Sequence, residues 1–473
     1  MTMTRPPDQP PHANALLYCA VNGIANNTNG IGRQTKTLLA TLAHHYNRLA
    51  QTAGAFTPYL AVPEPGPATW GYNPADLAHA RAIVEPLGGH VIALPYDTAR
   101  PLWRPSAWQT LSDHAAAAAR RLARTHERVL VIAVDTPFAG LATNIDPDEP
   151  IDVVLALFST ARITEHPPDP ARLAWEERAL AADSQSTHVR VADIGAYLTR
   201  HLQQHYHLTP GRLVPWPSGL HLTSADLAPP TITEAEQIAD RFDIPTQRPI
   251  IAAVGRTDHT KGLDLLIEAA APLRDQLHLA MIAVPTDDER AALLRQYRAR
   301  CAQLRLSATI VGHYSRALPR ALAALPATRA MVVPSRGETL ANIVFETGLW
   351  AQRHGALVLA PALDGFPEQI TDGHNGLLYE PDTPGALTAG LRRALALDDT
   401  ERHRIRKAAY RRVMAERDAT RHLDTLLTRI WRPSTRPVDT LLHHPVPDAR
   451  TPRSQAPTST SATLESPALE APP

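Results

Sequence analysis

Short apolar runs alternate along most of the chain with longer segments in which apolar residues recur every three or four positions. The runs have the length and the aliphatic, β-branched content of buried strands, and they cover residues 16–21, 129–134, 153–158, 250–254, 279–284, 330–333 and 357–359. Helical spacing is clearest at residues 35–46 and 262–273. Strands that alternate with helices are typical of βαβ units, so we predict an α/β fold with parallel sheets.

The length of the chain predicts two domains, because a single core stops growing near ~250–300 residues and this chain has 473. The best boundary is a stretch with three prolines and few large apolar residues. The expected parts are a disordered N-terminus at 1–12, a first domain at 13–223, a linker at 224–248, a second domain at 249–410, a last helix at 411–432 and a disordered tail, rich in Pro, Ser and Thr, at 433–473.

Composition excludes several classes of function. The chain has 47 basic and 47 acidic residues, without the basic excess expected of a nucleic-acid-binding protein. No apolar run reaches the ~18–20 residues that cross a bilayer, so no integral membrane contact is expected. The first residues lack the apolar segment of a secretory signal, and Cys19 and Cys301 are too few for a disulfide framework. We therefore expect a cytoplasmic protein, whose oligomeric state the sequence does not indicate.

The first predicted strand runs into a loop rich in Asn and Gly that precedes a helix. Gly30 and Gly32 would let the backbone approach a ligand, and the free N–H groups that open the helix would face an anion such as a diphosphate. The loop is not a GxGxxG dinucleotide motif, because Thr35 stands in place of the third glycine. The alternative is a turn that only connects the strand to the helix.

Two cations follow the predicted strand at 250–254. Arg256 and Lys261 lie at its C-terminal end, where α/β folds bind ligands. Arg256 can hold a phosphate through two parallel hydrogen bonds, and Lys261 adds a mobile charge. The alternative is a pair of solvated side chains that form ion pairs with Asp258 or Asp264.

Two carboxylates follow the predicted strand at 330–333. We expect Glu338 on a loop and Glu346 one or two turns into a helix, roughly 10 Å apart at the helical rise per residue. A retaining hydrolase needs its two carboxyl groups ~5 Å apart, so the spacing favours binding two hydroxyl-bearing ends of one long ligand. The alternative is a capping acid and an unrelated surface acid.

No spacing typical of a metal site or of a nucleophile elbow is found. Asp146 and Asp148 have DxD spacing, but their proline-rich acidic loop is typical of a turn. The 22 histidines form no HExxH pattern. Neither a metal nor another cofactor is therefore expected.

Taken in order, these residues resemble a family 4 glycosyltransferase over roughly residues 15–431. The similar segments are residues 29–33 (the family's GIGR loop), 175–221 (the stretch that ends in its PNGVD turn), 254–262 (VGR…KG), 338–346 (E-x7-E) and 365–378 (GG-PE-I…DG-TGLL). The resemblance implies the GT-B fold, in which two Rossmann-like domains with parallel sheets face each other across a cleft and a C-terminal helix crosses back to the N-domain.

The resemblance also implies a retaining glycosyltransferase whose donor is a nucleoside-diphosphate sugar. Gly30 and Gly32 would bring backbone near the diphosphate. Arg256 and Lys261 would stabilise the charge on the leaving nucleoside diphosphate, as a metal ion does in other transferases.

The same resemblance assigns the two glutamates to the donor. Glu338 would accept hydrogen bonds from the donor sugar, beside the backbone N–H groups of Leu340, Ala341 and Asn342. Glu346 would bind the ribose hydroxyls.

Several residues depart from the family pattern. Asp135 stands where a histidine often ends an N-domain strand, and it is our fourth candidate catalytic residue, with Glu338, Arg256 and Lys261. Phe158 replaces a second histidine. The usual EGFG loop lacks its glycines here, which can alter the choice of donor sugar.

The acceptor is expected to be a small soluble hydroxylated molecule, such as an intermediate of an aminoglycoside-like bacterial antibiotic. Glycolipid or polysaccharide acceptors are the alternative. The arginines between residues 100 and 128, interleaved with Trp103 and Trp108, are typical of a solvated face rather than a membrane-docking face. From other classes, a GT-B sugar-nucleotide epimerase and a catalytically inactive GT-B scaffold remain open. The missing third glycine disfavours a NAD-binding dehydrogenase or dinucleotide-binding module.

Overall fold

The computed structural model describes residues 13–26, 30–66, 71–97, 102–165, 167–181, 188–285 and 287–432. All of them lie in one unit that extends to Pro437. The predictions of disorder for residues 1–12 and 433–473 lie outside the described residues, as does Asn29 of the glycine loop.

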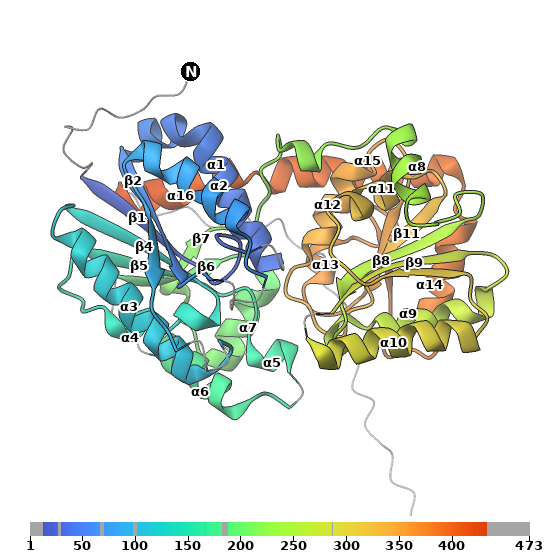
Figure 1. Ribbon diagram of the computed structural model, residues 1–473, viewed down its shortest axis with the longest axis horizontal. Helices are drawn as coiled ribbons and strands as arrows, with labels where there is room; N and C mark the ends of the chain where they lie inside the picture. The colour runs from blue at the N-terminus through green and yellow to red at the C-terminus, as the bar shows by residue number, and fades with distance from the viewer. Residues whose placement is uncertain are drawn as a thin grey trace, which may run out of the picture. The chain divides into compact units, whose positions relative to one another are not determined.

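The first domain is built on a seven-stranded sheet with the order β3-β2-β1-β4-β5-β6-β7. Every neighbouring pair is parallel. The strands are β1 (Asn14–Cys19), β2 (Phe56–Pro63), β3 (Val91–Leu94), β4 (Arg128–Val134), β5 (Ile151–Ala156), β6 (Val189–Asp193) and β7 (Leu213–Pro215), and all but β3 are labelled in Figure 1. The central strands are buried along almost their whole length, because helices cover both faces of a parallel sheet.

The connections of this sheet are helical, as the alternating pattern predicts. The helices are α1 (Gly30–Ala53), α2 (Pro74–Val84), α3 (Pro105–Ala123), α4 (Leu141–Asn144), α5 (Ala161–Thr164), α6 (Pro170–Ala181) and α7 (Ala196–Tyr206), with short 3₁₀ turns η1 (Glu85–Leu87), η2 (Thr136–Phe138) and η3 (Pro210–Arg212). Parallel neighbours require such crossovers, because the chain must return to the end of the sheet at which the previous strand began.

The second domain repeats this plan with a six-stranded parallel sheet of order β10-β9-β8-β11-β12-β13. Its strands are β8 (Ile250–Arg256), β9 (His278–Val284), β10 (Ala308–Val311), β11 (Thr328–Val332), β12 (Leu357–Pro361) and β13 (Leu377–Tyr379). Its helices are α8 (Ile232–Asp240), α9 (Leu263–Ala270), α10 (Asp288–Gln303), α11 (Ala317–Ala324), α12 (Asn342–Trp350), α13 (Phe366–Gln369), α14 (Ala386–Ala396) and α15 (Asp399–Glu416), with 3₁₀ turns η4 (Ala225–Leu227), η5 (His259–Lys261) and η6 (Ala271–Leu273).

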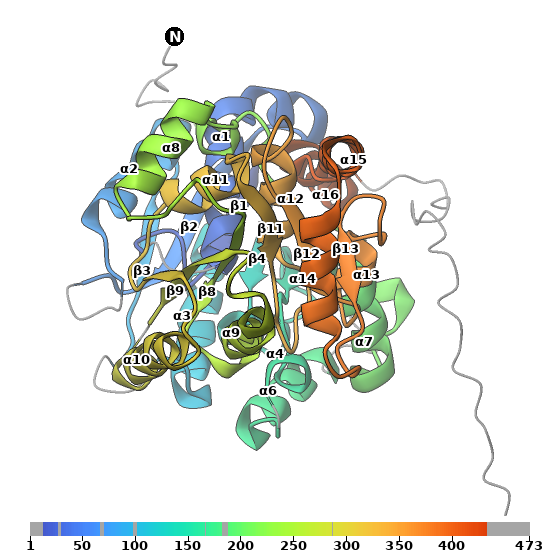
Figure 2. The same cartoon turned by 90° about the vertical axis from the view of Figure 1, so that its right-hand side faces the viewer.

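Two apolar clusters lie on the two faces of the second sheet. One contains side chains of α8, α11 and α12, and the other contains side chains of α9, α10 and α14. Figure 2 shows α8 and α11 on one side of β8 and β9, and α9 and α10 on the other. The two-domain α/β fold expected from the sequence is therefore confirmed.

The last helix, α16 (Ala419–Trp431), belongs to the core of the first domain although it follows the second in sequence. Leu423, Leu426 and Ile430 are buried among residues of the first domain, and Figure 1 shows α16 beside α1 while α15 lies with α11 and α12. Arg128 on β4 donates to the carbonyl oxygens of Ile430 and Trp431 at 2.8 and 3.1 Å, so it satisfies the C-terminal end of the helix. The expected return of the chain to the first domain is confirmed, but only α16 makes it: residues 411–416 of the helix expected at 411–432 belong to α15 and lie with the second domain.

The predicted linker at 224–248 contains ordered structure that packs on the second domain. Leu227, Ala235, Ala239 and Ile244 are buried in the cluster that α11 and α12 share. Helix α8 begins with a capping box, in which Thr231 accepts from Glu234 N and Glu234 accepts from Thr231 N. The small apolar residues of this stretch suit close helix packing, which a search for large apolar residues overlooks.

Thr231→Ala is expected to lower the free energy of unfolding by about 1 kcal/mol, the usual cost of losing an N-cap hydroxyl. The Oγ1 of Thr231 accepts from Glu234 N at 3.2 Å, and the Glu234 side chain, which caps the backbone N–H of Thr231, cannot replace this bond. Chemical denaturation of the purified protein measures the change. Thr231→Ser keeps the hydroxyl and should retain the stability of the wild type, and an equal loss in both variants would contradict the capping role.

Among the described residues, no helix is both long enough and apolar enough to cross a membrane.

Candidate functional site

The candidate residues lie beyond the carboxyl ends of strands in both sheets. Asp135 directly follows β4, Arg256 ends β8, and Glu338 lies in the loop after β11. In open parallel sheets this edge is where ligands bind, because the loops that follow the strands gather there. The prediction that Glu338 lies on a loop and Glu346 one or two turns into a helix is confirmed, because α12 begins at Asn342.

Lys261 and Glu338 form an ion pair. The Nζ of Lys261 donates to Oε2 of Glu338 at 2.7 Å, and the two side chains are 25% and 16% exposed. The backbone N–H of Glu338 donates to Asp364 at 3.1 Å, which orients the loop. The structure thus brings together two candidates that lie on separate loops of the second domain.

Asp258 forms an ion pair with Arg256, the other cation of this loop. Its carboxylate lies 3.1 Å from Nε of Arg256 and also accepts from the backbone N–H of Lys261 at 3.2 Å. The simple pairing considered for Arg256 is therefore present, whereas Lys261 pairs with Glu338 instead. Asp264, the other acid considered, pairs with Arg336 through both oxygens. The guanidinium of Arg256 remains 44% exposed and can accept a further anion.

The glycine loop packs closely where it meets α1. Gly23 has a φ of +94°, and a Cβ there would lie 2.5 Å from the carbonyl oxygen of Gly32 and 2.6 Å from Cβ of Thr35. Gly23 therefore provides the close contact between loop and helix, and Gly32 is buried in that contact. Gly30 is the exposed first residue of α1.

The N-termini of α1 and α12 meet through Asn342. The amide of Asn342 donates to the carbonyl oxygen of Gly30 at 3.1 Å and accepts from Gln34 at 3.1 Å. Two helix N-termini from different domains thus lie against each other, each with the partial positive charge that favours an anion.

Of the N–H groups assigned to the donor sugar, that of Ala341 is already occupied. It donates to the side-chain oxygen of Gln369 at 3.0 Å, and the amide of Gln369 donates back to the carbonyl of Ala341 at 3.0 Å. These two hydrogen bonds fix the loop in front of α12. Leu340 instead lies near Gly195 of the first domain, where a Cβ would be 3.5 Å from its side chain.

Asp135 is a buried, strained acid at the end of β4. Its φ of 65° and ψ of 176° lie in a region that essentially only glycine occupies. Its side chain is 6% exposed, and Oδ1 has no hydrogen-bond partner among the described residues. Burial raises the pKa of Asp135 to about 6, against the opposing charges of Arg172 and, from the second domain, Arg256. Backbone strain and a buried carboxylate oxygen without a hydrogen-bond partner are both typical of functional residues.

Glu176 supports the loop that carries Asp135. The sequence analysis assigned no role to Glu176. It is completely buried and accepts from Arg172 at 2.8 Å, Tyr206 at 2.8 Å and the backbone N–H of Ala161 at 3.0 Å. It also accepts from the hydroxyl of Thr136, the residue after Asp135, at 3.2 Å. A buried carboxylate with this many donors fixes the loop behind Asp135.

Glu346 and Arg33 form an ion pair across the two domains. Nε of Arg33 lies 3.1 Å from Oε1 of Glu346, and the guanidinium also bonds to Asp226. Burial raises the pKa of Glu346, while the charge of Arg33 opposes this and Asp226 adds to it. The sequence analysis placed Arg33 only in a loop motif, because no local pattern indicates a partner in another domain.

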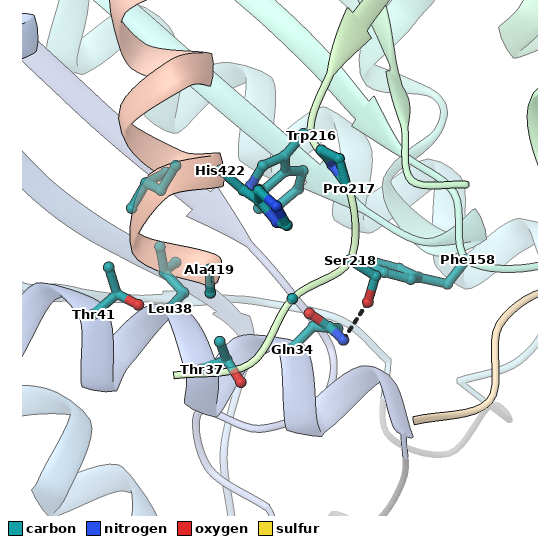
Figure 3. A pocket seen from close by; sticks show the side chains of 12 residues that line it. Gln34, Thr37, Leu38, Thr41, Phe158, Trp216, Pro217, Ser218, Ala419 and His422 are labelled. Carbon is teal, nitrogen blue, oxygen red and sulfur yellow. Dashed lines mark hydrogen bonds between the residues drawn. The ribbon is translucent and has the colours of Figure 1, made fainter. Parts of the chain in front are cut away.

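A small cavity lies beside the second and third turns of α1 (Figure 3). Gln34 points toward Ser218 and donates to its hydroxyl at 2.5 Å, and His422 of α16 lies across the cavity. None of the candidate donor-binding or catalytic residues lines it. The cavity therefore belongs to the crossing of α1 and α16 and not to the candidate site.

Within the described ranges, no group of three or more His, Cys, Asp or Glu side chains is arranged to hold a metal ion.

Comparison with known sequences identifies the second domain. Residues 234–412 match the family described as Glycosyl transferases group 1. A D-inositol 3-phosphate glycosyltransferase of Geodermatophilus obscurus is 28% identical over 246 residues, which are 50% of this chain and 50% of that protein. The chain thus spans about half the length of the curated relatives it matches.

Solved structures resemble almost the whole described chain. Sucrose-phosphate synthase from Thermosynechococcus elongatus has a TM-score of 0.67 at 18% identity, over 89% of this chain and 100% of that chain. HepE from Anabaena, solved with UDP and glucose, has a TM-score of 0.64 at 12% identity, over 88% and 99%. At these identities the likeness shows the fold, and it confirms the GT-B architecture expected from the sequence.

Proposed function

Because residues 234–412 match the family described as Glycosyl transferases group 1, we propose that this chain moves a sugar, with retention, from a nucleoside-diphosphate sugar to a hydroxyl group of a small acceptor. The observation that carries the proposal is the contact between Lys261 and Glu338 beside Arg256. A sugar diphosphate needs cations for its phosphates and a carboxylate for its hydroxyls, and these side chains supply both within one site.

The diphosphate is proposed to bind between Arg256, Lys261 and the N-termini of α1 and α12. When the bond from the sugar to the diphosphate breaks, negative charge grows on the leaving phosphate. Arg256 and Lys261 would stabilise that charge, and fixed donors of this kind supply a large part of many rate enhancements. A phosphate oxygen of the leaving group would then take the proton of the acceptor hydroxyl. The reaction in this form needs no metal ion.

Glu338 is proposed to bind hydroxyl groups of the donor sugar, and Glu346 those of the ribose. Lys261 holds one oxygen of Glu338, which orients the carboxylate toward the site. Asp135 faces the donor from the first domain, where Arg256 is close enough to lower its pKa. We assign Asp135 the positioning of a hydroxyl group of the sugar or of the acceptor.

A small soluble acceptor is favoured over a lipid or a polysaccharide. Support comes from the relative whose name gives D-inositol 3-phosphate, a small polyol, as its substrate. Among specialised metabolites, an aminoglycoside-like intermediate has the required hydroxyl groups. We propose that the enzyme acts in the cytoplasm, where nucleotide sugars are substrates.

Nucleotide binding tests the proposal. Thermal unfolding is measured in EDTA with UDP, GDP, ADP, dTDP and NAD offered separately. A ligand that binds only the folded state stabilises it by about 2.7 kcal/mol at one hundred times its dissociation constant. We expect a clear rise in Tm with one nucleoside diphosphate, and a much smaller rise with the same ligand in Glu346→Ala.

The other outcomes favour the other classes. A rise with NAD alone would replace the proposal by a dehydrogenase, and no rise with any ligand would favour an inactive scaffold. Binding that requires magnesium would contradict the metal-free site. An epimerase is distinguished by its products, since it releases no nucleoside diphosphate when it is incubated with the sugar nucleotide.

A further inference from the structure

Arg33 connects the first domain to the carboxylate proposed to bind the ribose. It lies in the first turn of α1, and its guanidinium reaches across to the second domain. Nε of Arg33 is 3.1 Å from Oε1 of Glu346, and a terminal nitrogen of the guanidinium donates to Asp226. The side chain of Arg33 is 22% exposed and that of Glu346 is 15% exposed, so both charges are largely removed from water.

The charge state of Glu346 depends on this one cation. Burial raises the pKa of Glu346, and the charge of Asp226 on η4 raises it further. Arg33 on α1 is the group that lowers it. An ionised carboxylate accepts hydrogen bonds on both oxygens, whereas a protonated one must donate from one of them. Vicinal hydroxyl groups are therefore bound best while Arg33 is in place.

The geometry leaves one oxygen of Glu346 available. Arg33 contacts Oε1, and no hydrogen bond from the described residues reaches Oε2. The neighbouring contacts hold α1 against α12 at the same place, through Gln34 and Asn342 at 3.1 Å and through Asn342 and Gly30 at 3.1 Å. Arg33 is thus held in register with the helix that carries Glu346.

We propose that Arg33 is a positioning residue for the ribose: it holds Oε1 of Glu346, so that Oε2 is presented to the 2′- and 3′-hydroxyl groups of the donor nucleotide. The inference rests on the proposed function, and it adds a part to the site that comes from the other domain. The ribose is fully bound only while the two domains are in contact, so donor binding and the contact between the domains support each other.

Discrimination between ribose and deoxyribose is the test. Titration calorimetry compares the nucleoside diphosphate that the wild type binds best with its 2′-deoxy form. We expect the wild type to prefer the ribose form and Arg33→Ala to bind it about tenfold less tightly, the order expected for losing a hydrogen bond to a charged group. The deoxy form should lose less, so the preference falls. A preference in Arg33→Ala equal to that of the wild type overturns the inference.

Two further variants separate positioning from a structural role. Lys36 lies on the same helix and pairs with Asp76 within the first domain at 3.2 Å, so Lys36→Ala should leave the preference unchanged. Arg33→Lys keeps a cation near Glu346 and should restore part of the preference. If Lys36→Ala lowers the preference as much as Arg33→Ala, the effect is a general one of α1, and the inference is wrong.

The pH dependence gives an independent readout. Binding of the ribose form by Arg33→Ala should weaken as the pH is lowered, because Glu346 then gains a proton more readily without its cation. The wild type and Lys36→Ala should change less. An identical pH profile in all three proteins contradicts the assigned role of Arg33. If the wild type binds no nucleoside diphosphate at all, the proposed function itself fails, which is a distinct result.

Discussion

Lys261→Ala is expected to lower kcat by about 10²–10³-fold, the usual cost of removing one fixed donor from a developing negative charge. Lys261 supplies an ammonium group from η5, the turn that follows β8, and its loss also leaves Glu338 without a cation at 2.7 Å. The carboxylate is 16% exposed, so its charge would then act on the leaving diphosphate with little screening. Steady-state release of nucleoside diphosphate, with the acceptor present, measures the effect.

Lys407→Ala is the matched control for this prediction. Lys407 is an exposed lysine on α15, in the same domain, and its replacement should leave kcat at the wild-type value. Lys261→Arg keeps the positive charge and should recover part of the rate. Wild-type kcat in Lys261→Ala, with Tm unchanged, would remove Lys261 from the proposed mechanism.

Asp135→Asn is expected to make the protein more stable near pH 8 and less active. Burial raises the pKa of Asp135 from its ordinary 3.8 to about 6, so the ionised form is disfavoured in the folded protein. A shift of this size corresponds to about 3 kcal/mol of destabilisation at high pH, which the amide removes. Turnover should fall about 10²-fold if Asp135 positions a reacting hydroxyl group.

The sign of the pH dependence follows from the direction of that shift. A folded protein that binds its proton more tightly than the unfolded chain gains stability at low pH. The contribution of Asp135 is therefore greatest below about pH 4 and is lost as the pH rises through about 6. The stability difference between Asp135→Asn and the wild type should thus be largest near pH 8 and vanish near pH 4.

Denaturant unfolding at several pH values tests this difference. Asp148→Asn makes the same chemical change at an exposed position of the same domain, so it should show no such dependence. Asp135→Gly should be more stable still, because glycine also relieves the backbone strain at φ 65°, worth about 1–3 kcal/mol. A loss of stability near pH 8 in both Asp135 variants would show that Asp135 stabilises the folded protein. It would contradict the view that Asp135 lowers the stability and is kept for its function.

Residues 250–254 and 330–333 show how much of the fold a local pattern carries. Both runs lie within strands of the second sheet, β8 and β11, because a strand covered on both faces must be apolar along its length. The strands that the pattern misses include β3 and β10, four-residue strands at the edges of their sheets. Both are largely apolar (VIAL and ATIV), but a run of four residues is too short to be told from a helix segment by its pattern.

Features that depend on residues close together in the sequence could likewise be predicted without a structure. The placement of Glu338 on a loop and Glu346 inside a helix follows from the end of the preceding strand, and α12 confirms it. The capping box that starts α8 is also visible in the local sequence, as Thr231 and Glu234 three positions later. It could have corrected the expectation of a linker at 224–248.

The sequence by itself determined the two α/β domains and the order of the motifs, because strand and helix periodicity and turn residues act over a few positions. Only the tertiary structure decided the partners: Lys261 with Glu338, Arg33 with Glu346, and Arg256 near Asp135. The two members of each pair come from separate loops or helices, and most pairs join separate domains. Their charge states depend on burial and on the distance to a cation, which no spacing along the chain records.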